Sequence, residues 1–185
     1  MLEQAWIIVA IPALSFVLIL LLGKRFPNKG SEIGITAVGA SFVLSIVAVV
    51  QWIQRVDDAT GHSEGLRALG RGLFNAEGHG AEAAVQPVVN TLTWWQNDFV
   101  KFTVGTRMDG LVVMMLFVVT LISLLVHIYS LAYLRGDVRY THYYAMLSLF
   151  TASMLLLVVS ANTLQMLVGW EGVGLCSFEI GRAHV

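Results

Sequence analysis

Long apolar runs that carry almost no charge constrain this chain more than any other feature. A helix needs about 20 predominantly apolar residues to cross the hydrocarbon core of a bilayer. Such runs, the last of them shorter than the others, cover residues 5–23, 33–53, 111–134, 143–161 and 164–178. We therefore predict an all-α integral membrane protein with about five transmembrane helices, arranged as part of a helical bundle.

The composition agrees with a membrane protein and excludes several other classes. Hydrophobic residues make up 57% of the chain and charged residues 12%, against about 25% charged residues in soluble domains. The net charge of −1 gives no reason to expect a nucleic-acid partner. The single cysteine, Cys176, excludes an internal disulfide and a multi-cysteine metal site, and we predict no metal site. Glu3 stands where a signal peptide would be basic, so we expect an uncleaved first helix.

The apolar runs divide the chain into segments. We expect peripheral transmembrane helices 1 and 2 within residues 1–53, an outward-facing loop over 54–108, and helices 3 to 5 over 109–178. Within the loop, residues 55–86 are rich in glycine, alanine and charge and predict a flexible connection. Residues 99–104 alternate in polarity as a strand does, so we expect a small hairpin at the outer surface.

Positive charge in the short loops predicts the orientation. Lys24, Arg25 and Lys29 follow the first helix, and Arg135 and Arg139 follow the third. Short loops rich in lysine and arginine stay in the cytoplasm. We therefore expect residues 24–32 and 135–142 to be cytoplasmic, with the N-terminus and the 54–108 loop outside.

One carboxylate, Glu171, stands inside the last apolar run, LQMLVGWEGVGLCSF. A charge at bilayer depth costs about 2.5–3.5 kcal/mol on insertion scales, and acids retained there usually belong to proton or ion pathways. Gly169, Gly172 and Cys176 form a stripe of small residues beside it, which predicts close helix packing. We expect Glu171 to point into a bundle interior or a hydrated cavity and to transfer protons. The alternative is a protonated side chain that only hydrogen-bonds between helices.

A second polar feature lies on the third run, where Thr120, Ser123, His127 and Ser130 recur at helical spacing. We call these four residues the polar seam. His127 can be a proton relay, because imidazole titrates near neutral pH. The alternative is a structural seam whose side chains hydrogen-bond across helices.

The last seven residues, EIGRAHV, interrupt the apolar pattern of the fifth run. They match the translation of a common sequencing-adapter read, and we interpret residues 179–185 as that artefact. The alternative is a genuine polar terminus after a short helix. On the first interpretation the chain is a fragment cut inside helix 5.

Two stretches resemble a known family. Residues 107–137, RMDGLVVMMLFVVTLISLLVHIYSLAYLRGD, and residues 143–178, which contain GWEGVGLCSF, are similar in order and spacing to subunit L of bacterial NADH–quinone oxidoreductase. The mitochondrial counterpart is NADH dehydrogenase subunit 5. Agreement extends over about residues 92–178 and is looser in the first helix.

The resemblance implies a proton-translocating, antiporter-like subunit in the membrane arm of respiratory complex I, in the inner (plasma) membrane. It places Glu171 at the family's key glutamate, which works with a lysine on a broken helix beyond these residues. The first of two inverted repeats would begin near residue 143. NADH, FMN, iron–sulfur clusters and quinone belong to other subunits in this family, so we expect no cofactor in this chain. Its partners would be other membrane-arm subunits, lipid and protons.

Three alternatives remain open on the sequence. A multi-subunit cation/proton antiporter and a hydrogenase-linked pump share the glutamate of helix 5. A structural membrane scaffold would use Glu171 for packing only.

Overall fold

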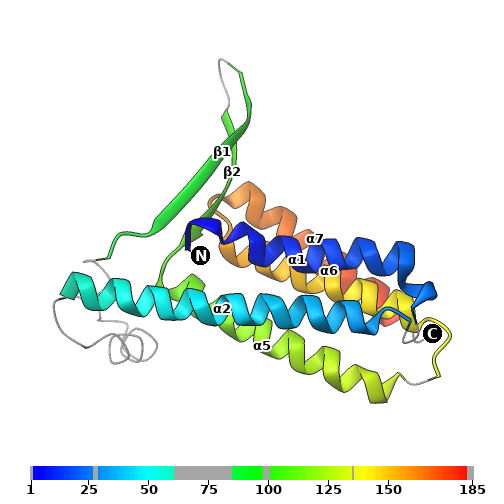
Figure 1. Cartoon of the computed structure of the whole chain (residues 1–185). Helices are drawn as coiled ribbons and strands as arrows, with labels where there is room; N and C mark the ends of the chain where they lie inside the picture. The colour runs from blue at the N-terminus through cyan, green and yellow to red at the C-terminus, as the bar shows by residue number, and fades with distance from the viewer. Residues whose placement is uncertain (1, 27–28, 61–84, 98–100, 135, 183–185) are drawn as a thin grey trace.

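The computed structural model describes residues 2–26, 29–60, 85–97, 101–134 and 136–182. Long helices and one hairpin account for most of them (Figure 1). In chain order the elements are η1 Leu2–Gln4, α1 Trp6–Leu22, η2 Gly23–Arg25, α2 Ser31–Thr60, β1 Val88–Gln96, β2 Lys101–Met108, α5 Gly110–Tyr133, α6 Tyr140–Val159 and α7 Thr163–Arg182.

The helices α1, α2, α5 and α6 form a closed ring, with a smaller contact across it between α2 and α6. In chain order the contacts run from α1 to α2, from α2 to α5, from α5 to α6 and back to α1. The last helix, α7, lies outside this ring against α6, and the hairpin projects away from one end of the bundle (Figure 1). Side chains at the ring centre, such as Ile8, Leu116 and Leu155, are fully buried.

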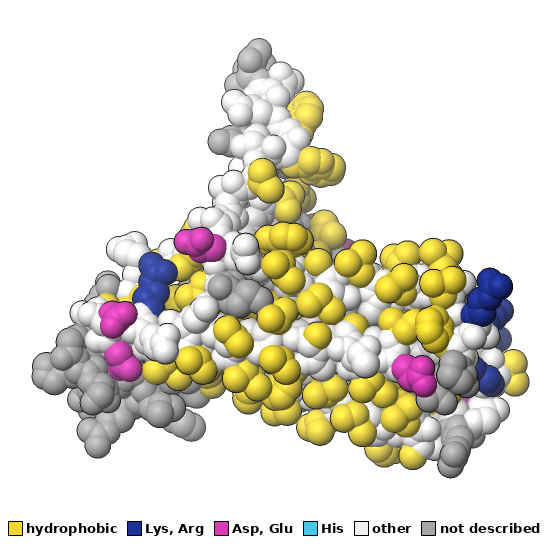
Figure 2. All heavy atoms as spheres, viewed as in Figure 1, with side chains coloured by type: hydrophobic (Ala, Val, Ile, Leu, Met, Phe, Trp, Pro, Cys, Tyr) yellow, Lys and Arg dark blue, Asp and Glu magenta, His cyan; other side chains and the backbone are white. Residues whose placement is uncertain are grey.

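The outer surface of the helices is apolar, as a lipid-facing surface must be. Four helices in the described part of the chain are long and apolar enough to span a membrane, and they correspond to α1, α2, α5 and α6. Leu21 is 75% exposed and Leu125 is 57% exposed. Hydrophobic side chains cover most of the visible face of the bundle (Figure 2). The predicted all-α integral membrane fold is therefore confirmed.

The fifth predicted helix is present, but it is more polar than the other four. Residues 164–178 lie within α7, which has 20 residues. It is absent from the four apolar candidates, because Gln165, Glu171 and Glu179 interrupt its hydrophobic sequence.

The second helix continues beyond the end that its apolar run predicts. We expected residues 33–53, and α2 extends to Thr60. Trp52 and Val56 are both nearly buried in the main core, so packing against the bundle extends the helix past the membrane-like sequence. Of the predicted flexible connection over 55–86, residues 61–84 lie outside the described residues.

The expected hairpin is confirmed and begins before the alternating residues 99–104. Strands β1 and β2 pair antiparallel, with Val88 opposite Met108 and an irregularity between Thr93 and Trp95. Gly105 permits the close pairing, because a Cβ atom there would lie 2.2 Å from the carbonyl oxygen of Asn90.

Hydrogen bonds fasten the base of the hairpin to the helices. The Asn90 side chain donates to the carbonyl of Glu3 at 2.7 Å. The side chain of Asn162 donates to the carbonyl of Thr103, and its Oδ1 accepts from Gln165 N at 2.8 Å, which caps α7. One asparagine thus fixes both the hairpin and the start of the last helix.

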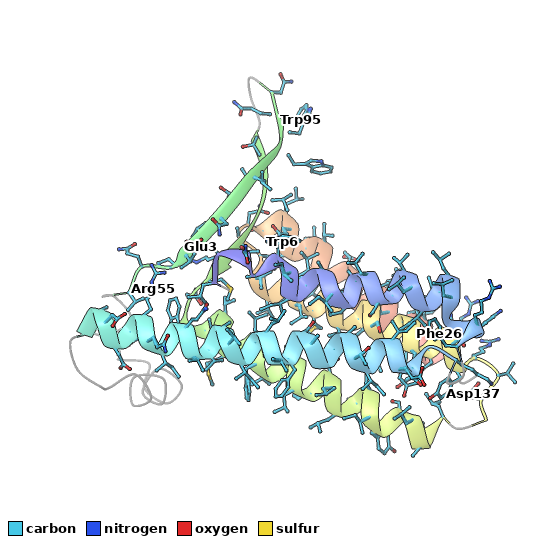
Figure 3. All side chains as sticks on the ribbon, viewed as in Figure 1. Glu3, Trp6, Phe26, Arg55, Trp95 and Asp137 are labelled. Carbon is cyan, nitrogen blue, oxygen red and sulfur yellow. The ribbon has the colours of Figure 1, made fainter. Side chains whose placement is uncertain are left out.

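The two basic loops lie at the same end of the bundle. Phe26 and Asp137, one in each loop, lie together at one end, whereas Glu3 and Arg55 lie at the other (Figure 3). This arrangement is the one that the orientation prediction requires. Which end faces the cytoplasm stays a prediction.

Cysteine labelling tests that orientation in intact cells. In a Cys176→Ala background, we expect Val138→Cys to resist a membrane-impermeant maleimide, because the basic loop would be cytoplasmic. Val138 is 98% exposed, so poor reaction could not be due to burial. The matched control is Gln96→Cys on the exposed hairpin, which should react. Labelling of Val138→Cys with protection of Gln96→Cys would reverse the topology.

Candidate functional site

The position of Glu171 is set by how closely α7 approaches α6. Gly169 and Cys176 are buried at this contact. A Cβ atom on Gly169 would lie 2.7 Å from the backbone nitrogen of Leu157, so only glycine permits the observed approach. A Cβ atom on Gly172 would likewise meet the Ser153 hydroxyl at 2.5 Å. The predicted small-residue stripe is therefore the surface by which α7 packs.

Glu171 lies on the opposite side of α7. At 3.6 residues per turn it stands about 200° around the helix from Gly169. Its side chain is exposed, with Trp170 and Phe178, at 67% and 64% exposure, on the same open side. We expected Glu171 to point into a bundle interior or a hydrated cavity. It faces away from the interior of the described bundle, and its surroundings in a longer protein stay a prediction. The glycine stripe is the face that packs, and it turns the carboxylate outward.

No compensating group reaches Glu171 in the described part of the chain. The ion pairs found there join Arg107 to Asp109 and His142 to Glu179, at 3.6 and 3.7 Å, and neither involves Glu171. With a rise of 1.5 Å per residue, Glu171 lies about 12 Å along α7 from Thr163. It is thus an uncompensated carboxylate about midway along the helix.

The polar seam faces the inside of the helix ring. Thr120 shares a hydrogen bond of 2.9 Å with Ser45 of α2. Ser123 hydrogen-bonds Thr151 of α6, and Ser130 hydrogen-bonds Tyr143 at 3.1 Å. These contacts join α5 to both neighbours, as the structural alternative for the seam requires.

His127 is fully buried within this seam. Its Nδ1 lies 2.8 Å from the carbonyl oxygen of Ser123, one turn earlier in the same helix. Because a carbonyl oxygen only accepts, Nδ1 carries a proton, and Nε2 of the neutral ring is then an acceptor. The Tyr144 hydroxyl donates to the carbonyl of His127 at 2.8 Å, and the two rings meet edge to face.

The structure does not bring the two predicted site residues together. His127 lies inside the ring on α5, whereas Glu171 lies on the outer side of α7, with α6 between the two helices. Sequence analysis missed Tyr144 as a partner of His127. Its hydroxyl bonds a backbone carbonyl, and side-chain patterns give no signal for such a contact.

The terminal residues that we interpret as an adapter translation continue α7 as far as Arg182. Glu179 contacts His142 there, and the Arg139 side chain donates to the carbonyl of Arg182. Residues 183–185 lie outside the described residues. The artefact interpretation stays a prediction, because a short polar stretch can extend a helix whatever its origin.

Gly169 provides a test of the contact that orients Glu171. We expect Gly169→Ala to lower the free energy of unfolding by about 1–3 kcal/mol, because an added Cβ overpacks the backbone of α6. Gly174→Ala is the matched control, since nothing lies within 4 Å of a Cβ atom there. Alanine has the higher helix propensity, so the control should be neutral or stabilising. Thermal unfolding in detergent measures both, and equal effects would refute the close contact.

Comparisons with known proteins agree with the resemblance. Residues 94–144 match the family model described as NADH-Ubiquinone oxidoreductase (complex I), chain 5 N-terminus. Subunit L of F(420)H(2) dehydrogenase from Methanosarcina mazei is 34% identical over 95% of this chain and 21% of its own length.

Two further relatives carry NADH oxidoreductase names. NADH-ubiquinone oxidoreductase chain 5 of Metridium senile is 51% identical over 46% of this chain and 14% of its own length. NADH-quinone oxidoreductase subunit L of Escherichia coli strain K12 is 37% identical over 74% of this chain and 22% of its own length. The chain spans about a fifth or less of the length of these relatives. The resemblance to the subunit L and chain 5 family is therefore confirmed, and it extends over most of this chain.

Proposed function

We propose that this chain is part of a proton-translocating membrane-arm subunit of an NADH–quinone oxidoreductase, which couples quinone reduction to proton pumping. The observation that carries the proposal is Glu171, an exposed carboxylate with no ion-pair partner among the described residues, midway along a helix packed on a membrane bundle. Similarity to subunit L and chain 5 proteins supports it independently.

In this proposal Glu171 takes up and releases a proton. A lone carboxylate facing lipid would cost about 2.5–3.5 kcal/mol, so the open face of α7 needs cover. Further helices of a longer protein would supply that cover, together with a lysine that pairs with Glu171 when it is ionised. The partner lysine is implied by the resemblance. When the lysine moves away, Glu171 would take up a proton, and when the lysine returns, Glu171 would release it.

His127 has a positioning role in this proposal. Its Nδ1 hydrogen-bonds the carbonyl of Ser123 in its own helix, and its backbone carbonyl accepts from the Tyr144 hydroxyl of α6. The contact with Tyr144 holds α5 against α6. Of the two candidate site residues, we assign proton transfer to Glu171.

The proposed subunit performs no redox chemistry itself. NADH, FMN, iron–sulfur clusters and quinone would be bound by other subunits, and this chain would carry no cofactor. Its partners would be the neighbouring membrane-arm subunits, lipid and the transported protons. As a multi-pass protein similar to a bacterial subunit L, it would reside in the inner membrane.

A second electron donor has specific support. The relative that covers 95% of the chain is a subunit of F(420)H(2) dehydrogenase. The same proton-translocating role could therefore operate in a complex that oxidises reduced F420. Membranes from the source cell distinguish the two, because oxidation of NADH or of reduced F420 would identify the donor.

Replacing the carboxylate in the full-length protein tests the proposal. We expect Glu171→Gln to lower the number of protons pumped per electron pair in inverted membrane vesicles, because the amide keeps the shape but cannot exchange a proton. Glu3→Gln is the matched control, since this carboxylate lies at the exposed end of the bundle. Unchanged pumping in an assembled Glu171→Gln complex would favour a structural scaffold.

A further inference from the structure

Two buried polar atoms in the helix ring lack a hydrogen-bond partner among the described residues. They are Nε2 of His127 and Oγ of Ser148, on α5 and α6. Both side chains are fully buried. A buried polar atom left without a partner costs about 1–3 kcal/mol. By contrast, the buried hydroxyls of Thr120 and Thr151 do find partners.

Both side chains border the same point, beside Gly34 of α2. A Cβ atom on Gly34 would lie 3.3 Å from Cδ2 of His127, the ring carbon bonded to Nε2. It would lie 3.4 Å from Oγ of Ser148 and 3.5 Å from the Ile19 side chain. The two side chains with unpaired atoms therefore lie beside the same residue of α2, in a region that Ile19 of α1 also borders. We call this region the Gly34 niche.

The chemistry of the niche suits a water molecule. Nε2 of His127 is an acceptor, because Nδ1 holds the ring proton. The Ser148 hydroxyl can donate or accept. A buried water needs two to four polar partners and space of roughly one probe sphere. Two ligands of this kind are too few to hold a metal ion, and the described residues contain no cluster of three or more histidine, cysteine, aspartate or glutamate side chains that could hold one.

We propose that the Gly34 niche binds one structural water, which donates to Nε2 of His127 and hydrogen-bonds Oγ of Ser148. Gly34 is three residues from the start of α2, so the niche lies about 5 Å along that helix, near the basic-loop end. The water joins α5 to α6 beside α2, as the direct Ser45–Thr120 bond joins α2 to α5 further along.

Changes in Tm caused by two substitutions, Ser148→Ala and Gly34→Ala, test the proposal in the full-length protein. If the niche is dry, Ser148→Ala removes an unpaired buried hydroxyl and raises Tm. If it holds the water, Ser148→Ala breaks a hydrogen bond and lowers Tm, by about 2 °C. Thermal unfolding in lipid nanodiscs measures the change. A Tm that rises or stays constant would overturn the proposal.

Gly34→Ala gives the second change, because its Cβ would displace the water. We expect a lower Tm, and a smaller loss when Gly34→Ala is made in the Ser148→Ala background. An equal loss in both backgrounds would overturn the proposal. The added Cβ would also lie 3.4 Å from Oγ of Ser148, so a smaller loss supports the site only together with density for the water. Gly39→Ala is the control on the same helix, since a Cβ atom there has its nearest neighbour at 3.9 Å. Its Tm should stay constant or rise.

Density for the water can be observed directly. In a map of the full-length protein that resolves ordered waters, we expect a peak within hydrogen-bonding distance of Nε2 of His127 and Oγ of Ser148. The peak should be absent in Gly34→Ala. A wild-type map that shows other buried waters but none here would refute the site.

Discussion

The close backbone approach of α7 to α6 at Gly169 decides which way Glu171 faces. Among the described long helices, this is the only carboxylate near the middle of a helix. A Cβ atom on Gly169 would lie 2.7 Å from the backbone nitrogen of Leu157, so these helices meet with no side chain between them at that point. Within a membrane, apolar side chains gain little by leaving lipid, and small residues that permit close contact direct helix association. Once this stripe is buried, rotation of α7 is fixed and Glu171 must face away.

Several polar side chains inside the helix ring have hydrogen-bond partners on neighbouring helices, whereas Glu171 outside the ring has no ion-pair partner among the described residues. Thr120, Ser123 and Ser130 each hydrogen-bond a neighbouring helix, so their polarity is matched within these residues. Glu171 has no such match in the described part of the chain. A carboxylate kept without a local partner is better explained by proton transfer with a group on another segment than by packing within this bundle. Similarity to much longer subunit L and chain 5 proteins indicates where such a segment would come from.

Sequence patterns predicted the elements of this fold better than their relative rotations. Apolar length was sufficient for the helices, and alternation around residues 99–104 was sufficient for the hairpin. The extension of α2 to Thr60 depends on burial of Trp52 and Val56 against distant parts of the chain, which a local pattern does not contain.

For the candidate site, too, local features were predicted from the sequence, whereas contacts between distant parts of the chain were not. The stripe of Gly169, Gly172 and Cys176 was recognised from the sequence as a packing surface. The sequence did not reveal that Glu171 faces away from the helices that the structure describes. The meeting of Gly34, His127 and Ser148 was equally invisible, because it joins three separate helices.

Infrared difference spectroscopy of the intact complex tests most directly the central claim that Glu171 exchanges a proton during turnover. Protonation of a carboxylate creates a carbonyl stretching band, and ionisation removes it. The account predicts a carbonyl band that changes when electron donor and quinone are added, and that is missing from the Glu171→Gln difference spectrum. An identical difference spectrum in the wild-type and Glu171→Gln complexes would show that this carboxylate keeps one protonation state throughout, and would contradict the account.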